Sequence, residues 1–394
     1  MRANLLHQRL LFSLIIIIFF GLLLLRLDFL SAPKLYDEIT FWKTSLIFSD
    51  RLIPTLNQLR SYGELNTPLP FLIYGALEHL FGHGLWLGRL LNLILLFVIA
   101  AAIGWPRSGT HRSLLCLVGL LLFPYNILYG GRLYTDIIAC FWVLLGVVGY
   151  QRKQHSLSCL AFILAISSRQ FAVAFPAAIC LYEVTNSLLR LKQSNQFNLS
   201  DQWRWIAPLL ATLSLLGWIY LFQGLTPQVE SALNKVDPNV QETAWALDPG
   251  RAINYLGAVA TYIVIPEFIL FRRWRNLSLP KQRRLIIGTA SLLLILTIIS
   301  PPLLYTRNSV NLVAGIFNNT NYEFIGASIY YLLSLLTVLR FSQPNPLSLM
   351  VLTNGIVMAK VYPWDKYLWP LVVVFWYLKN KHPKELSQAE TKRT

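Results

Sequence analysis

Charged residues are scarce in this chain of 394 residues, where they make up only 13% of the sequence. Soluble domains carry about twice that share. Hydrophobic residues account for 55% of the chain. A soluble protein of this length needs far more polar surface to cover its core. The composition therefore excludes a soluble enzyme, a secreted domain and a disordered chain.

Cysteine is also rare, and the four cysteines lie inside apolar runs, at Cys116, Cys140, Cys159 and Cys180. Their spacing fits neither a disulfide framework nor a zinc site, so we expect small buried side chains. The sequence lacks a Walker motif, a nucleotide-binding glycine fingerprint and an HExxH motif. We expect no cofactor, because the adjacent acids Asp37 and Glu38 are a small ligand set for a divalent metal.

Long runs of Leu and Ile recur from one end of the chain to the other, as at 14–25 and 285–299. A transmembrane helix needs about 20 mostly apolar residues. We therefore predict an all-α polytopic membrane protein, one domain over 1–394, with about twelve transmembrane helices. The expected spans are 11–27, 85–104, 113–129, 134–150, 157–170, 171–189, 205–223, 252–271, 285–305, 322–340, 346–361 and 367–379.

The net charge of +16 is distributed unevenly. With twelve spans, the basic groups at 107–112, 272–284 and in the tail 380–394 fall on one side, which the positive-inside bias predicts to be cytoplasmic. Acidic residues fall on the other side, at Asp37, Glu38, Asp50, Glu64, Glu230, Asp237, Glu242, Asp248 and Asp365. We expect the basic loops to contact anionic lipid, and no nucleic acid, since they carry no nucleic-acid module.

Two long loops lie on the predicted outer side, over 28–84 and 224–251. Loops of that size are usually functional. The first contains an amphipathic stretch over 38–50, which predicts a helix lying in the membrane interface. It also contains a short apolar stretch over 70–82, typical of a re-entrant or interfacial helix.

Asp37 and Glu38 follow the first span directly. Asp37 could act as a general base toward an acceptor hydroxyl, because partial burial beside lipid makes a carboxylate more basic. The alternative is that these acids only cap the start of the interfacial helix.

Two further charged segments lie at the predicted outer helix ends. The segment 130–136 contains Arg132 and Asp136. These two residues are either part of a functional site or a local ion pair that stabilises a glycine turn. Arg169 and Gln170 occupy the turn between the fifth and sixth spans. The fork of Arg169 matches phosphate oxygens, or else it snorkels to lipid headgroups.

The segment 362–370 places Asp365, Lys366 and Tyr367 between aromatic residues. Aromatic residues at this depth form an interfacial belt in many membrane proteins. Lys366 is unusual on this side of the membrane, and it could hold a lipid-linked phosphate as a point charge.

These features occur in an order that resembles the GT-C glycosyltransferases, polytopic enzymes that use polyprenyl-phosphate sugars. A carboxylate just after the first span marks that superfamily, and Asp37 stands there. Three motifs are similar to those of the dolichyl-phosphate-glucose-dependent α-1,2-glucosyltransferases, namely Tyr134-Thr135-Asp136, Arg169-Gln170 and Lys366-Tyr367 before Pro370. The family's Arg-Tyr is Lys366-Tyr367 here.

The resemblance implies inverting transfer of a hexose, with glucose suggested by the glucosyl branch, from a polyprenyl-phosphate donor to a hydroxyl of a glycan or lipid acceptor. It implies Asp37 as the base. Phosphate-neutralising candidates are Arg132, Arg169 and Lys366. Sugar-lining candidates are Tyr36, Tyr134 and Trp364. Further substrate-binding candidates are Glu38, Asp136, Gln170, Asp365 and Tyr367.

Short loops favour a bacterial inner membrane with a periplasmic site; a eukaryotic chain would place the site in the lumen of the endoplasmic reticulum. Two other functional classes stay open. One is a transporter or lipid-linked sugar flippase, for which twelve spans are a common layout. The other is a structural membrane subunit.

Overall fold

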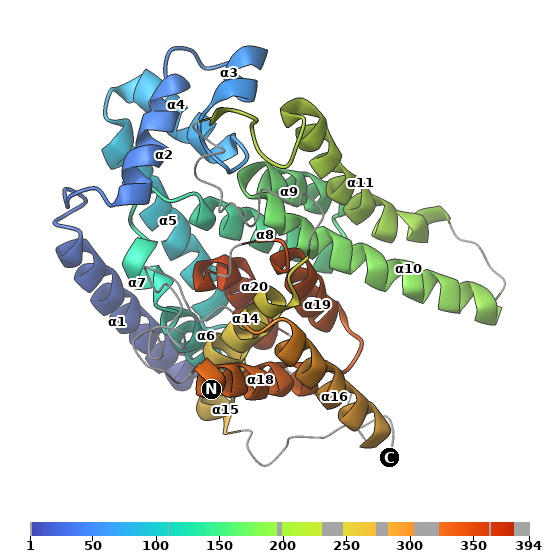
Figure 1. Cartoon of the computed structure of the whole chain (residues 1–394). Coiled ribbons are helices and arrows are strands. Elements are labelled where there is room, and N and C mark those ends of the chain that lie inside the picture. The colour runs from blue at the N-terminus through green and yellow to red at the C-terminus, as the bar shows by residue number, and fades with distance from the viewer. Residues whose placement is uncertain are drawn as a thin grey trace.

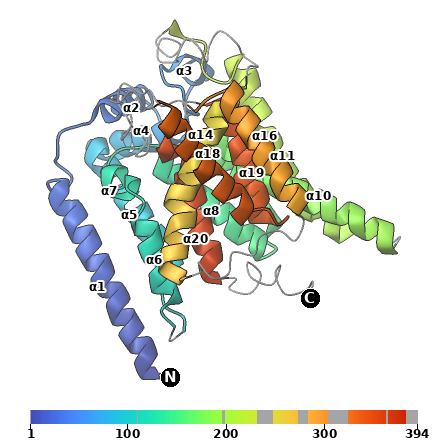
Figure 2. The same cartoon turned by 60° about the horizontal axis from the view of Figure 1, so that its bottom comes forward.

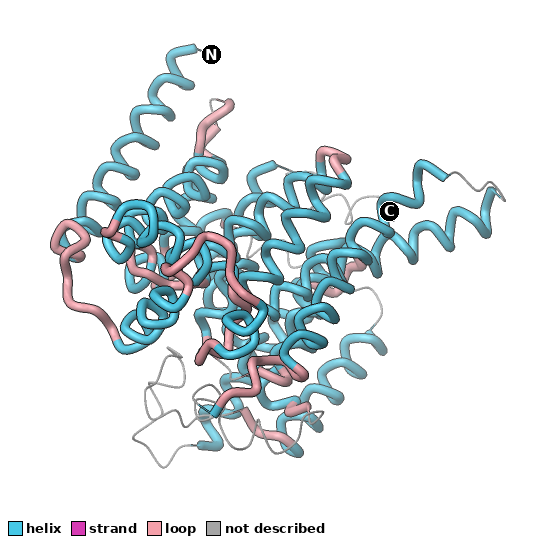
Figure 3. The backbone as a smooth tube through the Cα atoms, turned by 90° about the horizontal axis from the view of Figure 1, so that it is seen from above, coloured by secondary structure: helices cyan, strands magenta, loops and turns pink. Residues whose placement is uncertain are grey.

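A computed structural model of the chain describes residues 2–108, 110–194, 199–230, 247–272, 283–302, 323–361 and 364–381. Every regular element in these ranges is a helix, which confirms the predicted all-helical class (Figure 3). Five segments are long and apolar enough to cross a membrane: Asn4–Arg26, Gly84–Gly104, Gln170–Leu191, Gln202–Phe222 and Pro249–Phe271. Shorter apolar helices accompany them, so the protein is polytopic, while the count of twelve spans stays a prediction.

The first half of the described chain contains α1 (Arg2–Arg26), α2 (Tyr36–Ile47), α3 (Leu56–Ser61), α4 (Leu69–Phe81), α5 (Gly84–Gly104), α6 (Arg112–Leu121), α7 (Tyr125–Tyr129), α8 (Asp136–Gln151), α9 (His155–Ser168), the 3₁₀ turn η1 (Gln170–Val173) and α10 (Ala174–Ser194). The second half contains α11 (Leu199–Phe222), α14 (Pro249–Val259), the π-helical η2 (Ala260–Val264), α15 (Ile265–Phe271), α16 (Arg283–Ile299), α18 (Glu323–Arg340), α19 (Pro346–Met358), the 3₁₀ turn η4 (Asp365–Leu368) and α20 (Trp369–Lys381).

Prolines account for the main departures from the predicted spans. The single helix predicted over 113–129 is wrong, because the chain turns at Pro124 and splits into α6 and α7. Proline has no N–H to continue a helix and clashes with the preceding turn. The span predicted over 252–271 runs through a π-helical turn just before Pro266. Such turns absorb a local break in the hydrogen-bond ladder.

The first outer loop is largely helical. It folds into α2, α3 and α4, which gather at one end of the molecule (Figures 1 and 2). α2 covers most of the predicted amphipathic stretch, and α4 ends at Gly82, whose φ of 63° is in the left-handed region that glycine adopts without strain. In Figure 2, α1 runs from the α2 end of the molecule toward the opposite end; it packs against α6, and its Phe20 ring meets Phe97 of α5.

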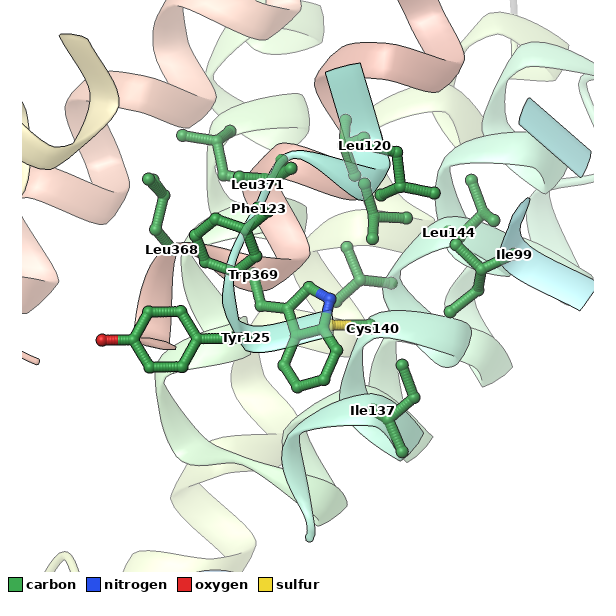
Figure 4. Close-up of a cluster of buried hydrophobic side chains, with 14 of the residues drawn as sticks. Ile99, Leu120, Phe123, Tyr125, Ile137, Cys140, Leu144, Leu368, Trp369 and Leu371 are labelled. Atoms are coloured by element: carbon green, nitrogen blue, oxygen red, sulfur yellow. The ribbon is translucent and has the colours of Figure 1, made fainter. Parts of the chain in front are cut away.

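The core is organised around α20, whose residues 371–375 are fully buried. α20 packs against α5, α6 and α8. At its start, the Trp369 indole lies among Leu120, Phe123 and Cys140 (Figure 4), and its Nε1 donates to Asn126 Oδ1 at 2.9 Å. Cys116 and Cys140 are buried as predicted, whereas Cys159 and Cys180 are only half-buried; all four cysteines are free. This packing fixes the start of α20 and, with it, the preceding turn η4 and Lys366; η4 also packs against α14.

Candidate active site

Asp37 and Lys366 meet at the end of the molecule formed by α2. Asp37 lies in the first turn of α2, and Lys366 lies in η4, just before the buried α20. The distance from Lys366 Nζ to Asp37 Oδ2 is 3.2 Å, and the Asp37 side chain keeps 27% of its surface exposed. Two residues 329 positions apart therefore form an ion pair that solvent can reach from the Asp37 side.

Aromatic rings surround the ammonium group of Lys366. Its Nζ lies 3.7 Å from the ring centre of Trp364, 5.6 Å from Tyr134 and 5.8 Å from Tyr367. Such rings attract a cation through their negative faces. The pKa of Lys366 is lowered from its ordinary value, because burial disfavours the charged form more than Asp136 and Asp37 favour it.

Glu38 is fully buried, and its carboxylate is held in a clamp formed with Arg89. Arg89 Nε and Nη2 donate to its two carboxylate oxygens, both at 2.8 Å, and the Leu133 N–H donates to Oε1 at 2.8 Å. Burial alone would raise the pKa of Glu38, but the bonds from Arg89 and Leu133 outweigh it and the pKa is lowered. Glu38 therefore anchors α2 to α5.

Arg89 is absent from the residues that the motifs select. It is the only charged residue of α5, lies in the second turn of that helix, and its side chain is 1% exposed. An ionisable residue within an apolar span is the signal that could have found it. Its Nη1 also donates to the Leu30 carbonyl at 2.6 Å, so it joins α5 to the loop that precedes α2.

Arg132 strengthens the same clamp. Its Nη1 donates to the Pro33 carbonyl at 2.8 Å and to Glu38 Oε2 at 3.2 Å. The local pair with Asp136, one of the two sequence-based interpretations, is wrong, because Asp136 pairs with a different arginine. A role for Arg132 in binding phosphate stays a prediction.

Asp136 and Arg169 form a second, buried ion pair. Arg169 Nη2 lies 2.6 Å from Asp136 Oδ2, and Arg169 also donates to the Asn66 side chain. Because Arg169 is 5% exposed, the interpretation that it snorkels to headgroups is wrong. Among the described residues, Asp136 Oδ1 and Arg169 Nε have no hydrogen-bond partner. Buried groups of this kind are rare and mark places where a ligand can complete the bonding.

Tyr367 connects the two ion pairs. The Arg169 guanidinium carbon lies 5.6 Å from the Tyr367 ring centre, on the ring that also faces Lys366. The structure therefore brings Asp37, Asp136, Arg169 and Lys366 around one aromatic side chain, although they come from four separate segments.

The remaining predicted residues lie around this group. Gln170 Nε2 donates to the carbonyls of Leu65 and Leu225, at 2.7 and 3.1 Å, so it ties the two outer loops together. Tyr134 is buried and stacks on Tyr129 with ring centres 4.2 Å apart.

Asp365 lies on the other side of η4, where its Oδ2 accepts from the Tyr262 hydroxyl at 2.9 Å. The side chain of Tyr36 lies outside the described residues. Within the described ranges, no three His, Cys, Asp or Glu side chains gather as a metal ion would need. The absence of a cofactor stays a prediction.

Comparison with known proteins gives one family. The model of the DIE2/ALG10 family matches residues 77–274, half of the chain. The matched range contains Arg89, Arg132, Asp136 and Arg169, whereas Asp37 and Lys366 lie outside it. No curated protein and no solved structure matches the chain.

Proposed function

The chain belongs to the DIE2/ALG10 family, the dolichyl-phosphate-glucose α-1,2-glucosyltransferases of the GT-C superfamily, and from this premise we propose an inverting hexosyl transfer from a polyprenyl-phosphate donor. Membership confirms the resemblance found in the sequence and makes the protein a membrane glycosyltransferase that uses a lipid-linked sugar. Glucose is the proposed sugar, and a hydroxyl of a glycan or lipid is the proposed acceptor.

Asp37 is the proposed base, and one observation carries this assignment. The Asp37 side chain is 27% exposed, whereas those of Glu38 and Asp136 are 0% and 1% exposed. A general base must reach the hydroxyl that it deprotonates. Glu38, the next residue, is clamped by Arg89, so the reachable carboxylate is also held in place by its neighbour.

Lys366 and Arg169 are the proposed partners of the donor phosphate. The acceptor oxygen attacks the anomeric carbon, its proton passes to Asp37, and the bonding electrons of the sugar–oxygen bond leave with the lipid phosphate. Cations that face this growing negative charge lower the barrier. Arg169 Nε, which has no hydrogen-bond partner among the described residues, gives the phosphate a donor that the protein does not use.

Inversion sets a geometric requirement on the Asp37–Lys366 pair. The base and the leaving phosphate act on opposite faces of the anomeric carbon, so the two side chains cannot stay 3.2 Å apart in the reacting complex. The donor sugar enters between them, Asp37 turns to the acceptor, and Lys366 turns to the phosphate. The half-buried Trp364, at the edge of this group, offers a ring face for the pyranose.

We place the site on the outer face, periplasmic in a bacterium or lumenal in a eukaryote. The positive-inside bias supports this side, because Arg107 and Arg152 follow α5 and α8, and Arg112 begins α6, at the other end of the bundle.

The test is transfer from a radiolabelled polyprenyl-phosphate hexose, measured in membranes that contain the wild-type chain or Asp37→Asn. Loss of a general base lowers such rates about 10²- to 10⁴-fold. Asp50→Asn is the matched control, because Asp50 is an exposed acid of the same outer loop. If Asp37→Asn is as active as the wild type, Asp37 is not the general base. If the protein flips the lipid-linked sugar without transferring it, the transporter alternative is favoured.

A further inference from the structure

A cavity of about 450 Å³ lies beside the clamp that holds Glu38. Its walls come from the linker between α1 and α2, over 30–34, from Trp42 of α2, and from the turn between α4 and α5. These elements belong to the α2 end of the molecule (Figure 1). Arg89 also lines the cavity, but the charged residues that meet around Tyr367 do not. The cavity is therefore distinct from the candidate active site and touches it only through the clamp.

The depth of this cavity is set by two candidate membrane spans. One span ends at Arg26, just before the linker, and the other begins at Gly84, in the cavity wall. Trp86 lines the cavity and is 46% exposed, and the nearby Phe29 and Phe81 are also exposed. Exposed aromatic residues at the ends of spans lie among lipid headgroups. A headgroup of the leaflet at the α2 end is therefore the ligand that this cavity meets.

The cavity offers one unpaired charge of each sign. Lys34 is exposed and, within the described ranges, forms no hydrogen bond or ion pair. Glu78 accepts a hydrogen bond from the Gly84 N–H at Oε2, at 2.6 Å, whereas its Oε1 accepts none from the described residues. Arg89 is already paired with Glu38. A complementary ligand therefore carries an anionic and a cationic group.

The linker in the cavity wall is strained. Three consecutive residues with side chains, Asp28, Phe29 and Leu30, have φ values of 46°, 47° and 72°. This left-handed region is disfavoured for bulky residues, and such backbone persists where its surroundings hold it in place. Arg89 Nη1 holds the Leu30 carbonyl at 2.6 Å. A ligand in the cavity would pack on the same linker, which leads into the helix that carries Asp37.

We propose that this cavity binds the headgroup of phosphatidylethanolamine, with the phosphate at Lys34 and the ammonium at Glu78. A primary ammonium donates hydrogen bonds to a carboxylate oxygen such as Glu78 Oε1, whereas the trimethylated ammonium of choline has no hydrogen to donate. The rings of Trp42 and Trp86 add attraction for the same cation. The bound lipid supports the strained linker and thereby the start of α2. This site does not depend on the proposed transfer reaction.

The test measures lipid binding to the purified full-length chain by native mass spectrometry and by thermal shift. The ligands, in separate arms, are phosphatidylethanolamine, phosphatidylcholine, phosphatidylglycerol and soluble phosphoethanolamine. Because His83 also lines the cavity, binding is measured at about pH 8, where an imidazole is mostly neutral. The cavity variants are Lys34→Gln and Glu78→Gln. Lys43→Gln and Asp50→Asn are the matched controls, because these exposed residues of the same loop do not line the cavity.

Phosphatidylethanolamine should bind and stabilise the wild type and both controls alike. Each cavity variant should bind it about tenfold more weakly, as expected for the loss of one hydrogen bond to a charged group. Phosphatidylglycerol lacks the ammonium, so the wild type should bind it about tenfold more weakly than phosphatidylethanolamine, and Glu78→Gln should remove that preference. Ser31→Trp fills the cavity from an exposed position and should abolish binding, which provides a test if the charge variants do not fold.

Three results overturn the proposal. The first is that folded cavity variants bind phosphatidylethanolamine as tightly as the wild type. The second is that the wild type binds phosphatidylcholine or phosphatidylglycerol as tightly as phosphatidylethanolamine. The third is an equal thermal shift with phosphoethanolamine alone, which would identify a site for a soluble ligand. None of these results bears on sugar transfer, which is measured separately with a labelled donor.

Discussion

Two ionic clusters lie at opposite ends of the bundle, and they differ in how fully their charges are paired. At the far end, Glu267 accepts from Arg340 Nε and Nη2 at 2.8 and 2.9 Å and also from Lys379. Both of its oxygens are occupied and the side chain is fully buried. The cluster joins α15, α18 and α20.

At the α2 end, the pairing is incomplete. Asp37 is partly exposed, and one atom each of Asp136 and Arg169 lacks a partner in the described part of the chain. Removing one partner from a buried ion pair costs about 3–5 kcal/mol, because a charge is left unpaired. Complete pairing is what we expect of a cluster that only holds helices together, and the incomplete pairing at the α2 end is consistent with the proposed substrate site.

Among the cations of the site, the largest expected effect is on Lys366. Lys366→Met should lower sugar transfer about 10²- to 10³-fold, since it removes a charge that stabilises the leaving phosphate. Lys366→Arg should retain a measurable part of the activity, because it restores the positive charge. The measurement is single-turnover transfer with a labelled donor. If Lys366→Met is as active as the wild type, Lys366 serves only to hold Asp37.

Arg89 tests whether the Glu38 clamp positions the base. Arg89→Met leaves Glu38 buried without its main partner, so it should destabilise the protein by about 3 kcal/mol. It should also lower kcat about tenfold with little change in the KM for acceptor, because Asp37 loses its fixed position.

Arg89→Met/Glu38→Leu is the control for this prediction. It removes both charges, so stability should return while kcat stays low. Recovery of kcat along with stability would show that the clamp has only a structural role.

Gly119 tests the packing that places η4. A Cβ at this position would lie 2.3 Å from the Trp376 ring, so Gly119→Ala must displace the indole of α20. Overpacking of this kind costs about 1–3 kcal/mol. Thermal unfolding should detect the loss, and Gly217→Ala is the control, because a Cβ there meets nothing within 4 Å. Equal melting temperatures would contradict the close packing of α6 on α20.

The smallest effect concerns pH. In the proposed mechanism, the ammonium form of Lys366 neutralises the donor phosphate. Burial lowers the pKa of Lys366 below the usual 10.5, so transfer should fall as pH rises through this lowered pKa. Lys366→Arg should move that fall to higher pH, since arginine stays charged. A pH–rate profile measures the shift, and identical alkaline limbs in both proteins would exclude Lys366 as the titrating group.

Much of the helical framework can be predicted from the sequence. α5 and α8 nearly coincide with predicted spans, because long apolar runs bounded by polar residues leave little choice of helix ends. The break at Pro124 was missed because the surrounding residues are apolar enough to continue the run.

The pairing of charges could not be predicted. Motif order placed Asp37, Asp136, Arg169 and Lys366 on one side of the membrane, but which acid meets which base depends on how distant segments pack. Lys366 reaches Asp37 because η4 directly precedes α20, whose first residue, Trp369, is held in the core. Arg89 carries no motif, and only its burial against Glu38 shows its role.

The contrast between the two clusters is tested most directly by Asp37→Asn and Glu267→Gln, prepared together and measured for sugar transfer per folded molecule and for thermal unfolding. We predict that Asp37→Asn loses at least about 100-fold in transfer and keeps its melting temperature. Glu267→Gln should unfold at a clearly lower temperature, with a loss of about 3 kcal/mol, yet keep its transfer rate while folded. Two outcomes would contradict this contrast. One is that Asp37→Asn loses stability and keeps its transfer activity, and the other is that Glu267→Gln keeps its stability and loses its transfer activity.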